Sequence, residues 1–286
     1  MPDGAAGDAA FGEDAVIDDV FEQLGLDAAT LGAAVRLECR RTFRPPYEIP
    51  VIVAVNAALL LVLWWLLPQS AITRLTGNFA LPLCLASWMF SDVPATNTLA
   101  PDRVRVLAAL DQPVQLRRLM LAKNATLWLI ATPIGIAATV IVGAQTGEWT
   151  QAGIVALAVA TVPLGLLGIS SWLGILYPYH PRKLDWRWEH RRQLRLDARW
   201  MTLVLLPYML VPALAVIMAT PSILVWDIIA KHGLSSRLDD VELLVGVAIA
   251  ITISLVAWFW GTRGALRLIR IRHDQLAGYL DDPERG

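Results

Sequence analysis

The sequence predicts an all-α polytopic membrane protein with six transmembrane helices. Of its 286 residues, 56% are hydrophobic, against about 45–50% in soluble domains. Charged residues make up only 17%, against roughly 25% in soluble domains. The apolar residues are concentrated in runs of about 20, the length that crosses a bilayer as a helix.

Residues 1–48 are expected to form a cytoplasmic N-terminal region. It begins with an acidic tail that has no basic residue, and Phe11–Leu26 within it is either a short amphipathic helix or disordered. Ala28–Phe43 follows as an amphipathic helix whose arginines suit the headgroup plane, and Pro45-Pro46 ends it. The acidic residues of the tail are Asp3, Asp8, Glu13, Asp14, Asp18, Asp19, Glu22 and Asp27.

The membrane domain, residues 49–261, contains the six predicted spans. The second is the weakest, because its apolar part is short and only the polar run Ser91–Asn97 extends it. A basic cytoplasmic tail, 262–286, follows the last span. The spans are 49–67, 79–97, 125–142, 154–176, 201–220 and 241–260.

The distribution of basic residues predicts the orientation, because cytoplasmic loops are enriched in Lys and Arg. With the N-terminus inside, 21 of the 24 Lys and Arg residues lie in cytoplasmic pieces and three lie outside. Both termini are therefore expected in the cytoplasm.

Residues 222–240, between spans five and six, contain an apolar stretch too short to cross. Pro221 separates this stretch from span five. We expect an outer helical insertion here, and a simple extension of the fifth span is the alternative.

Pro101–Lys123 is a mixed polar and apolar segment between two hydrophobic runs. Pro101 suits a first helical turn, and Val104 and Leu107 share one face of a helix over Ala100–Gln112. Pro113 interrupts the pattern as a hinge or as the end of the helix. This helix is interpreted either as contacting another protein or as lying among lipid headgroups.

Catalytic and metal-binding motifs are not found. No G-x-x-x-x-G-K-[ST], H-E-x-x-H or C-x-x-C run occurs, so we expect no catalytic, metal or cofactor site on this chain. Cys39 and Cys84 lie in different environments and imply no disulfide. Loop 177–200 is rich in Arg and Trp, which beside a membrane favours anionic lipids over nucleic acid.

The expected spans carry no Lys, Arg, Asp or Glu at their centres, and Asp92 lies nearest to one. This composition favours a lipid-like or amphipathic cargo over ion-coupled transport. Candidate substrate-path residues are Asn56, Trp88, Asp92, Asn97, Trp128 and Trp172.

Asp102–Asn124 resembles a segment of permease subunits of ATP-binding-cassette exporters of the second type. The matching positions include the acidic-basic start Asp102-Arg103, then Pro113 and Arg118, and the pair Lys123-Asn124 before span three. Gly168–Pro181 is similar to that family's end of span four, although Ile169 stands where the family often has Asn. The span order also fits the family, whereas the acidic tail is not part of its pattern.

The resemblance implies that both inside loops contact a separate nucleotide-binding ATPase subunit, which holds ATP and Mg. It also implies a second six-span permease subunit, identical or different, across a substrate path in the plasma membrane. Val104, Leu107 and Leu110 would fill a groove on the ATPase, and Arg103 and Arg105 would pair with carboxylates at its rim. The full coupling set is Asp102, Arg103, Val104, Arg105, Leu107, Leu110, Pro113, Arg117, Arg118, His180 and Arg182.

Two other hypotheses stay open. One is a membrane-embedded lipid-modifying enzyme that presents Asp185, Glu189, His190 and Asp197 from loop 177–200. The other is a non-catalytic membrane assembly factor that binds a partner through the acidic tail.

Overall fold

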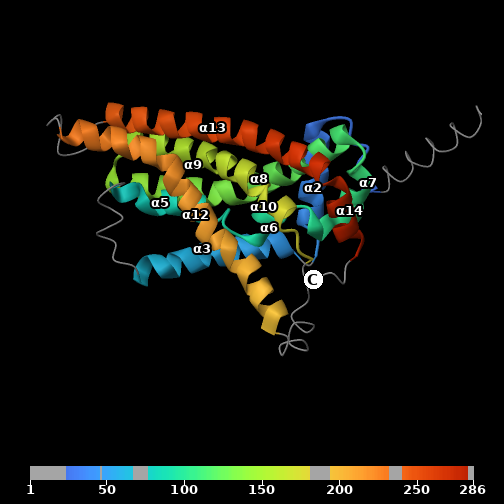
Figure 1. Cartoon of the computed structure of the whole chain (residues 1–286). Coiled ribbons are helices and arrows are strands. Elements are labelled where there is room, and N and C mark those ends of the chain that lie inside the picture. The colour runs from blue at the N-terminus through green and yellow to red at the C-terminus, as the bar shows by residue number, and fades with distance from the viewer. Residues whose placement is uncertain (1–23, 46, 67–76, 181–193, 232–239, 283–286) are drawn as a thin grey trace, which may run out of the picture.

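The computed structural model describes residues 24–45, 47–66, 77–180, 194–231 and 240–282, and these ranges are helical with no strand. Figure 1 shows an elongated bundle in which α8, α9 and α13 run along its length. Five described helices are long and apolar enough to cross a membrane: Glu48–Leu66, Pro113–Thr146, Trp149–Leu176, Val204–Val225 and Asp240–Ile271. The chain is therefore a multi-pass membrane protein.

A helical hairpin forms the centre of the bundle. Helix α8 (Pro113–Thr146) packs against α9 (Trp149–Ser170), and a short turn joins them. Pro113 is the first residue of α8, a position where the missing N–H of proline costs no helical hydrogen bond. It therefore neither ends a helix nor kinks one. Gly147 ends α8 with a φ of 77°, a left-handed conformation that favours glycine.

Close backbone contact joins α9 to α13 (Asp240–Ile271). A Cβ atom on Gly168 would lie 2.6 Å from Trp258 Cα, and one on Gly261 would lie 2.7 Å from the Gly168 carbonyl oxygen. Small residues allow this approach, which gives van der Waals contact where lipid offers no hydrophobic driving force.

The second predicted span is not one continuous helix. After η1 (Gly77–Phe79), α5 covers only Ala80–Trp88, and a second short helix, α6, covers Val93–Thr96. Nine residues rise about 14 Å, less than half of the hydrocarbon thickness of about 30 Å. The polar pair Ser91-Asp92 and Pro94 account for the break, because Asp92 caps α6 and proline restricts the residue before it.

The predicted outer insertion is also corrected. Helix α12 runs from Leu194 to Lys231 and passes through Pro221 without ending. The alternative of an extended fifth span is the one observed. Proline removes a single backbone hydrogen bond, and packing compensates, since Ser222 donates to the Gly246 carbonyl of α13 at 2.8 Å.

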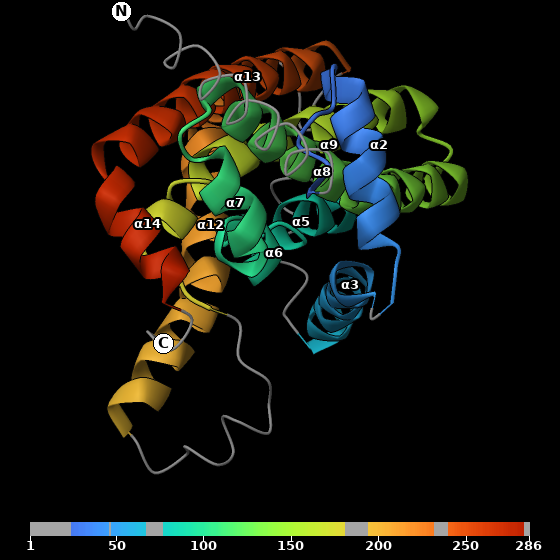
Figure 2. The same cartoon turned by 90° about the vertical axis from the view of Figure 1, so that its right-hand side faces the viewer.

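Four of the described helices from the segments expected in the cytoplasm lie at one end of the bundle (Figure 2). This end, called the α7 end below, contains α2 (Leu31–Thr42), η2 (Ala100–Asp102), α7 (Arg103–Ala109) and α14 (His273–Asp281). Helix α3 (Glu48–Leu66) runs from it along one edge of the bundle. A helix, α2, lies within the predicted range 28–43, whereas most of Phe11–Leu26 lies outside the described residues.

Candidate functional site

Helix α7 is the core of the candidate site, and the chain itself holds it in place. Its inner face, formed by Val106, Ala109 and Leu110, is buried in one cluster with Leu276 and Leu280 of α14. Val106 and Ala109 have no exposed surface. The short helix is therefore fixed by packing from a part of the chain 170 residues later, and it does not depend on its own helix propensity.

An ionic cluster joins α7 to two other helices. Arg105 lies 2.7 Å from Glu38 of α2 and 2.8 Å from Asp102, and Lys123 of α8 lies 3.1 Å from Glu38 and 2.9 Å from Asp102. The side chains of Arg105 and Glu38 are each 8% exposed. Two acids face two bases, so the four ion-paired groups together carry no net charge, which suits charged groups that are buried. Arg41 of α2 adds a more exposed positive charge within electrostatic range.

The pKa of Glu38 reflects this arrangement. Burial raises the pKa, but attraction to Lys123 and Arg105, together with their hydrogen bonds, outweighs burial and lowers it below the usual glutamate value. Glu38 therefore stays ionised at neutral pH and holds both cations.

Backbone contacts complete the attachment of α2. Arg41 donates to the Leu24 carbonyl at 2.7 Å, and Arg118 of α8 donates to the Ala28 carbonyl. Thr30 caps α2 by accepting from the Ala33 N–H at 3.2 Å. The amphipathic helix is thus bound to α7 and α8 as well as suited to a membrane surface.

The predicted coupling residues divide by exposure. Val104, Pro113 and Arg117 are exposed, and Arg103, Leu107, Arg118 and Asp102 are half-buried. Arg105 and Leu110 are buried and are used inside the chain. The surface that α7 offers to another protein therefore consists of Val104 and the half-buried Arg103 and Leu107, with the exposed Val114 and Arg117 from the start of α8. Leu107 also packs against the buried cluster on the inner face of α7.

His180, the predicted contact from the second inside loop, is also internal. Its ring stacks on Tyr279 of α14 with centroids 4.8 Å apart and planes 1° apart, and its Nε2 lies 3.0 Å from the Tyr279 carbonyl oxygen. The neighbouring Arg182 lies outside the described residues. His180 thus anchors α14 to the end of span four.

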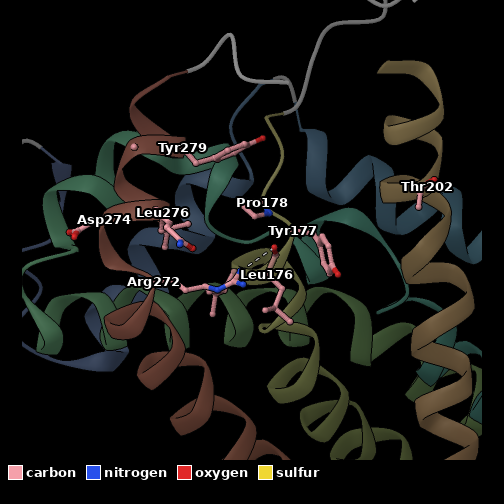
Figure 3. Close-up of a pocket in the computed structure, with 11 residues that line it drawn as sticks. Leu176, Tyr177, Pro178, Thr202, Arg272, Asp274, Leu276 and Tyr279 are labelled. Carbon is pink, nitrogen blue, oxygen red and sulfur yellow. Dashed lines mark hydrogen bonds between the residues drawn. The ribbon is translucent and has the colours of Figure 1, made fainter. Parts of the chain in front are cut away.

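A cavity of about 870 Å³ opens beside this anchor (Figure 3). Arg272 extends toward the Leu176 carbonyl oxygen, 3.5 Å away. In this view Tyr177 lies between Arg272 and Thr202 of α12.

The C-terminal helix, α14, was not expected at the site. The spacing of Leu276 and Leu280, one turn apart, is the pattern that could have indicated it.

The structure brings three of the predicted substrate-path residues together inside the bundle. Asn56, midway along α3, donates to Asp92 Oδ2 at 2.6 Å, and it accepts from the Tyr208 hydroxyl of α12 at 2.7 Å. The rings of Tyr208 and Trp88 lie 5.4 Å apart. Tyr208 had not been singled out in the sequence, because one tyrosine in an apolar run carries no spacing signal.

The other three path residues lie elsewhere. Asn97 donates to the Tyr179 carbonyl at 2.7 Å, and Trp128 donates to the Ala160 carbonyl at 2.7 Å. Trp172 donates to the Gly261 carbonyl at 2.7 Å. Each joins neighbouring segments of the bundle, so these three side chains stabilise helix packing.

The residues of the two other hypotheses are largely outside the described part of the chain, including the tail 1–23 and Asp185, Glu189 and His190. Within the described residues, no group of three or more His, Cys, Asp or Glu side chains is arranged to hold a metal ion. No family model, curated protein or solved structure matches the chain.

Proposed function

We propose that this chain is the membrane-spanning permease subunit of an ATP-driven exporter. Its α7 end would dock on a separate nucleotide-binding subunit, which holds ATP and Mg. The observation that supports the proposal is the attachment of α7, a short helix outside the apolar bundle, to both α2 and α8 through one neutral ionic cluster.

This attachment makes α7 suitable for transmitting motion. Helix α8 continues unbroken for 34 residues, about 51 Å, from the α7 end to the opposite end of the bundle. A push on α7 would reach Lys123 through Asp102 without passing through a flexible segment. Rigid elements of this kind carry displacement between sites.

The docking surface has the composition of a helix that inserts into a groove. Val104 and Leu107 are three positions apart and share a face, and Val104 is 57% exposed. Arg103 and Arg117 would flank this apolar pair and meet carboxylates at the groove rim.

The proposed topology has six crossings, with α5, the break and α6 forming the second as a discontinuous element. Both termini and the α7 end would face the cytoplasm from the plasma membrane, in keeping with the basic residues concentrated there. A second six-span subunit, identical or different, would complete the substrate path. Anionic lipids would contact the basic loop 177–200.

Co-purification of the tagged chain with a nucleotide-binding ATPase subunit tests the proposal. Val104→Asp should abolish or weaken co-purification at least tenfold, because it places a charge in the groove while the exposed position leaves the fold intact. Trp149→Asp is the matched control: it is 58% exposed at the opposite end, at the first position of α9, where an acid is tolerated. The absence of a bound ATPase, or equal binding by both variants, would contradict the proposal.

A further inference from the structure

The polar site, as the group of Asn56, Trp88, Asp92 and Tyr208 is called below, contains a buried carboxyl group, Asp92. Asp92 is 2% exposed and lies where α5 gives way to α6 within the bundle. Both of its carboxylate oxygens accept: Oδ2 from the Asn56 amide at 2.6 Å and Oδ1 from the Ala95 N–H at 3.4 Å. Ionisable residues inside a bundle usually mark a functional site.

Burial opposes ionisation of Asp92, and the hydrogen bonds that its carboxyl group accepts favour it. Tyr208 donates to the Asn56 amide oxygen, and the Asn56 amide nitrogen donates to Asp92. The donor chain therefore ends at the Asp92 carboxyl group, whose oxygens can only accept when the group is ionised. Hydrogen bonds to the charged form stabilise it.

A negative charge on Asp92 has no ion-pair partner in the described part of the chain. The ion pairs there join other groups, mainly the cluster of Glu38, Asp102, Arg105 and Lys123 at the α7 end. An unpaired carboxylate in a low-dielectric interior is unfavourable by several kcal/mol. Such a carboxyl group is neutralised either by a proton or by a cation from outside the chain, and the rings beside it distinguish the two.

Aromatic rings set the class of cation. Trp88 and Tyr208 lie 5.4 Å apart with their planes at 49°, next to the carboxylate network. The indole Nε1 of Trp88 is buried without a hydrogen-bond partner among the described residues. Aromatic faces attract organic cations, whose weak hydration lets them leave water more readily than metal ions.

We propose that Asn56, Trp88, Asp92 and Tyr208 form the binding site for an apolar organic monocation, the substrate class of the exporter. This inference rests on the proposed function. The cation would pair with Asp92 and lie against the two aromatic rings, while its apolar body contacts the spans. Asn56 and Asp92 are each 2% exposed, so a cation would enter by separation of α3 from α12, which the Tyr208–Asn56 hydrogen bond joins.

The position of α3 suits such an opening. Only Val53, Asn56, Ala57 and Leu60 of its 19 residues are buried, and it lies along the edge of the bundle (Figure 1). The hydrogen bond between Tyr208 and Asn56 directly joins it to α12. Movement of α3 away from α12 would break that bond and expose Asp92 to the entering cation.

Equilibrium binding to the purified full chain in phosphatidylcholine nanodiscs tests the proposal. The probes are tetraphenylphosphonium and tetraphenylborate, which share shape and apolar surface but carry opposite charge. Tetraphenylphosphonium should bind saturably and tetraphenylborate should not compete. Non-saturable binding of the cation, or equal competition by the anion, would overturn the proposal, and this comparison needs no variant.

Variants then locate the site. Asp92→Asn should weaken tetraphenylphosphonium binding at least tenfold, Asp92→Glu should restore part of it, and Tyr208→Leu should weaken it several-fold. Glu148→Gln, at a half-buried carboxylate in the turn between α8 and α9 that accepts from Asn78, should bind like the unaltered chain. Equal affinity of Asp92→Asn and the unaltered chain would refute the assignment to this site.

The two proposals fail separately. Cation binding is measured without an ATPase, so its loss would leave co-purification through α7 untouched. Conversely, a chain that binds the cation but never an ATPase would contradict the exporter proposal alone.

Discussion

Arg105 and Glu38 are separated by 67 positions in the sequence, yet their charged atoms lie 2.7 Å apart and are almost fully buried. This pair joins α2 to α7. Because Asp102 and Lys123 complete a neutral set of two acids and two bases, the balance of charge matters more than any one contact.

Breaking that balance should be costly. Arg105→Met leaves the cluster with one excess negative charge, and Glu38→Leu leaves one excess positive charge. Each should lower the free energy of unfolding by about 3–5 kcal/mol, whereas the double variant restores neutrality and should lose less than the sum. Thermal or denaturant unfolding in detergent measures this, with the exposed Arg117→Met as control. Additive losses would show that the charges act independently.

The pH dependence of stability should show how much ionised Glu38 contributes to the free energy of unfolding. Its pKa is lowered in the folded chain, so its contribution is complete above the unfolded pKa and is lost as pH falls through the folded value. The stability difference between the unaltered chain and Glu38→Gln should stay constant from pH 7 to about pH 5 and close below about 4.3, the ordinary glutamate pKa. A difference that widens on acidification would contradict the sign of the shift.

Packing between α9 and α13 should be sensitive to size at one glycine. Gly168→Leu places a side chain against the backbone of Trp258, which cannot move aside, and should cost about 1–3 kcal/mol or more. Gly153→Leu is the matched control on the same helix, where an added Cβ meets nothing within 4 Å. Equal melting temperatures for the two variants would mean that the close approach does not stabilise the bundle.

Much of the architecture could be predicted from the sequence because lipid imposes it. A long apolar run in a bilayer must be helical, so α3, α8, α9, α12 and α13 were expected near their observed positions. The second span could not be predicted as a broken helix. Its break depends on Asp92 capping α6 and bonding to Asn56 of α3, a contact that apolar periodicity does not encode.

The candidate site was predictable only in part, because the type of a residue does not determine whether its side chain is exposed. Val104 and Leu110 share the apolar character expected of a docking face, yet packing on α14 buries only Leu110. Glu38 carried a signal that was missed: it is the one acidic residue of α2, between Arg36 and Arg40. When an arginine-rich, half-buried helix contains a single acidic residue, that residue is expected to form an ion pair with a basic residue elsewhere in the chain.

The C-terminal helix should be essential to the shape of the α7 end. Leu280 has no exposed surface and packs in the cluster that contains Val106 and Ala109, so Leu280→Asp buries a charge and removes apolar contact. We expect a loss of about 2–5 kcal/mol and release of α14, because a detached helix can solvate the new carboxylate. Limited proteolysis should then cut α14 and leave the spans intact. Ile271→Asp, at an 80% exposed position just before α14, is the matched control and should resist cleavage like the unaltered chain. Equal cleavage of both variants would contradict the prediction. It would mean that α14 is held by its covalent attachment to α13 and does not depend on packing against α7.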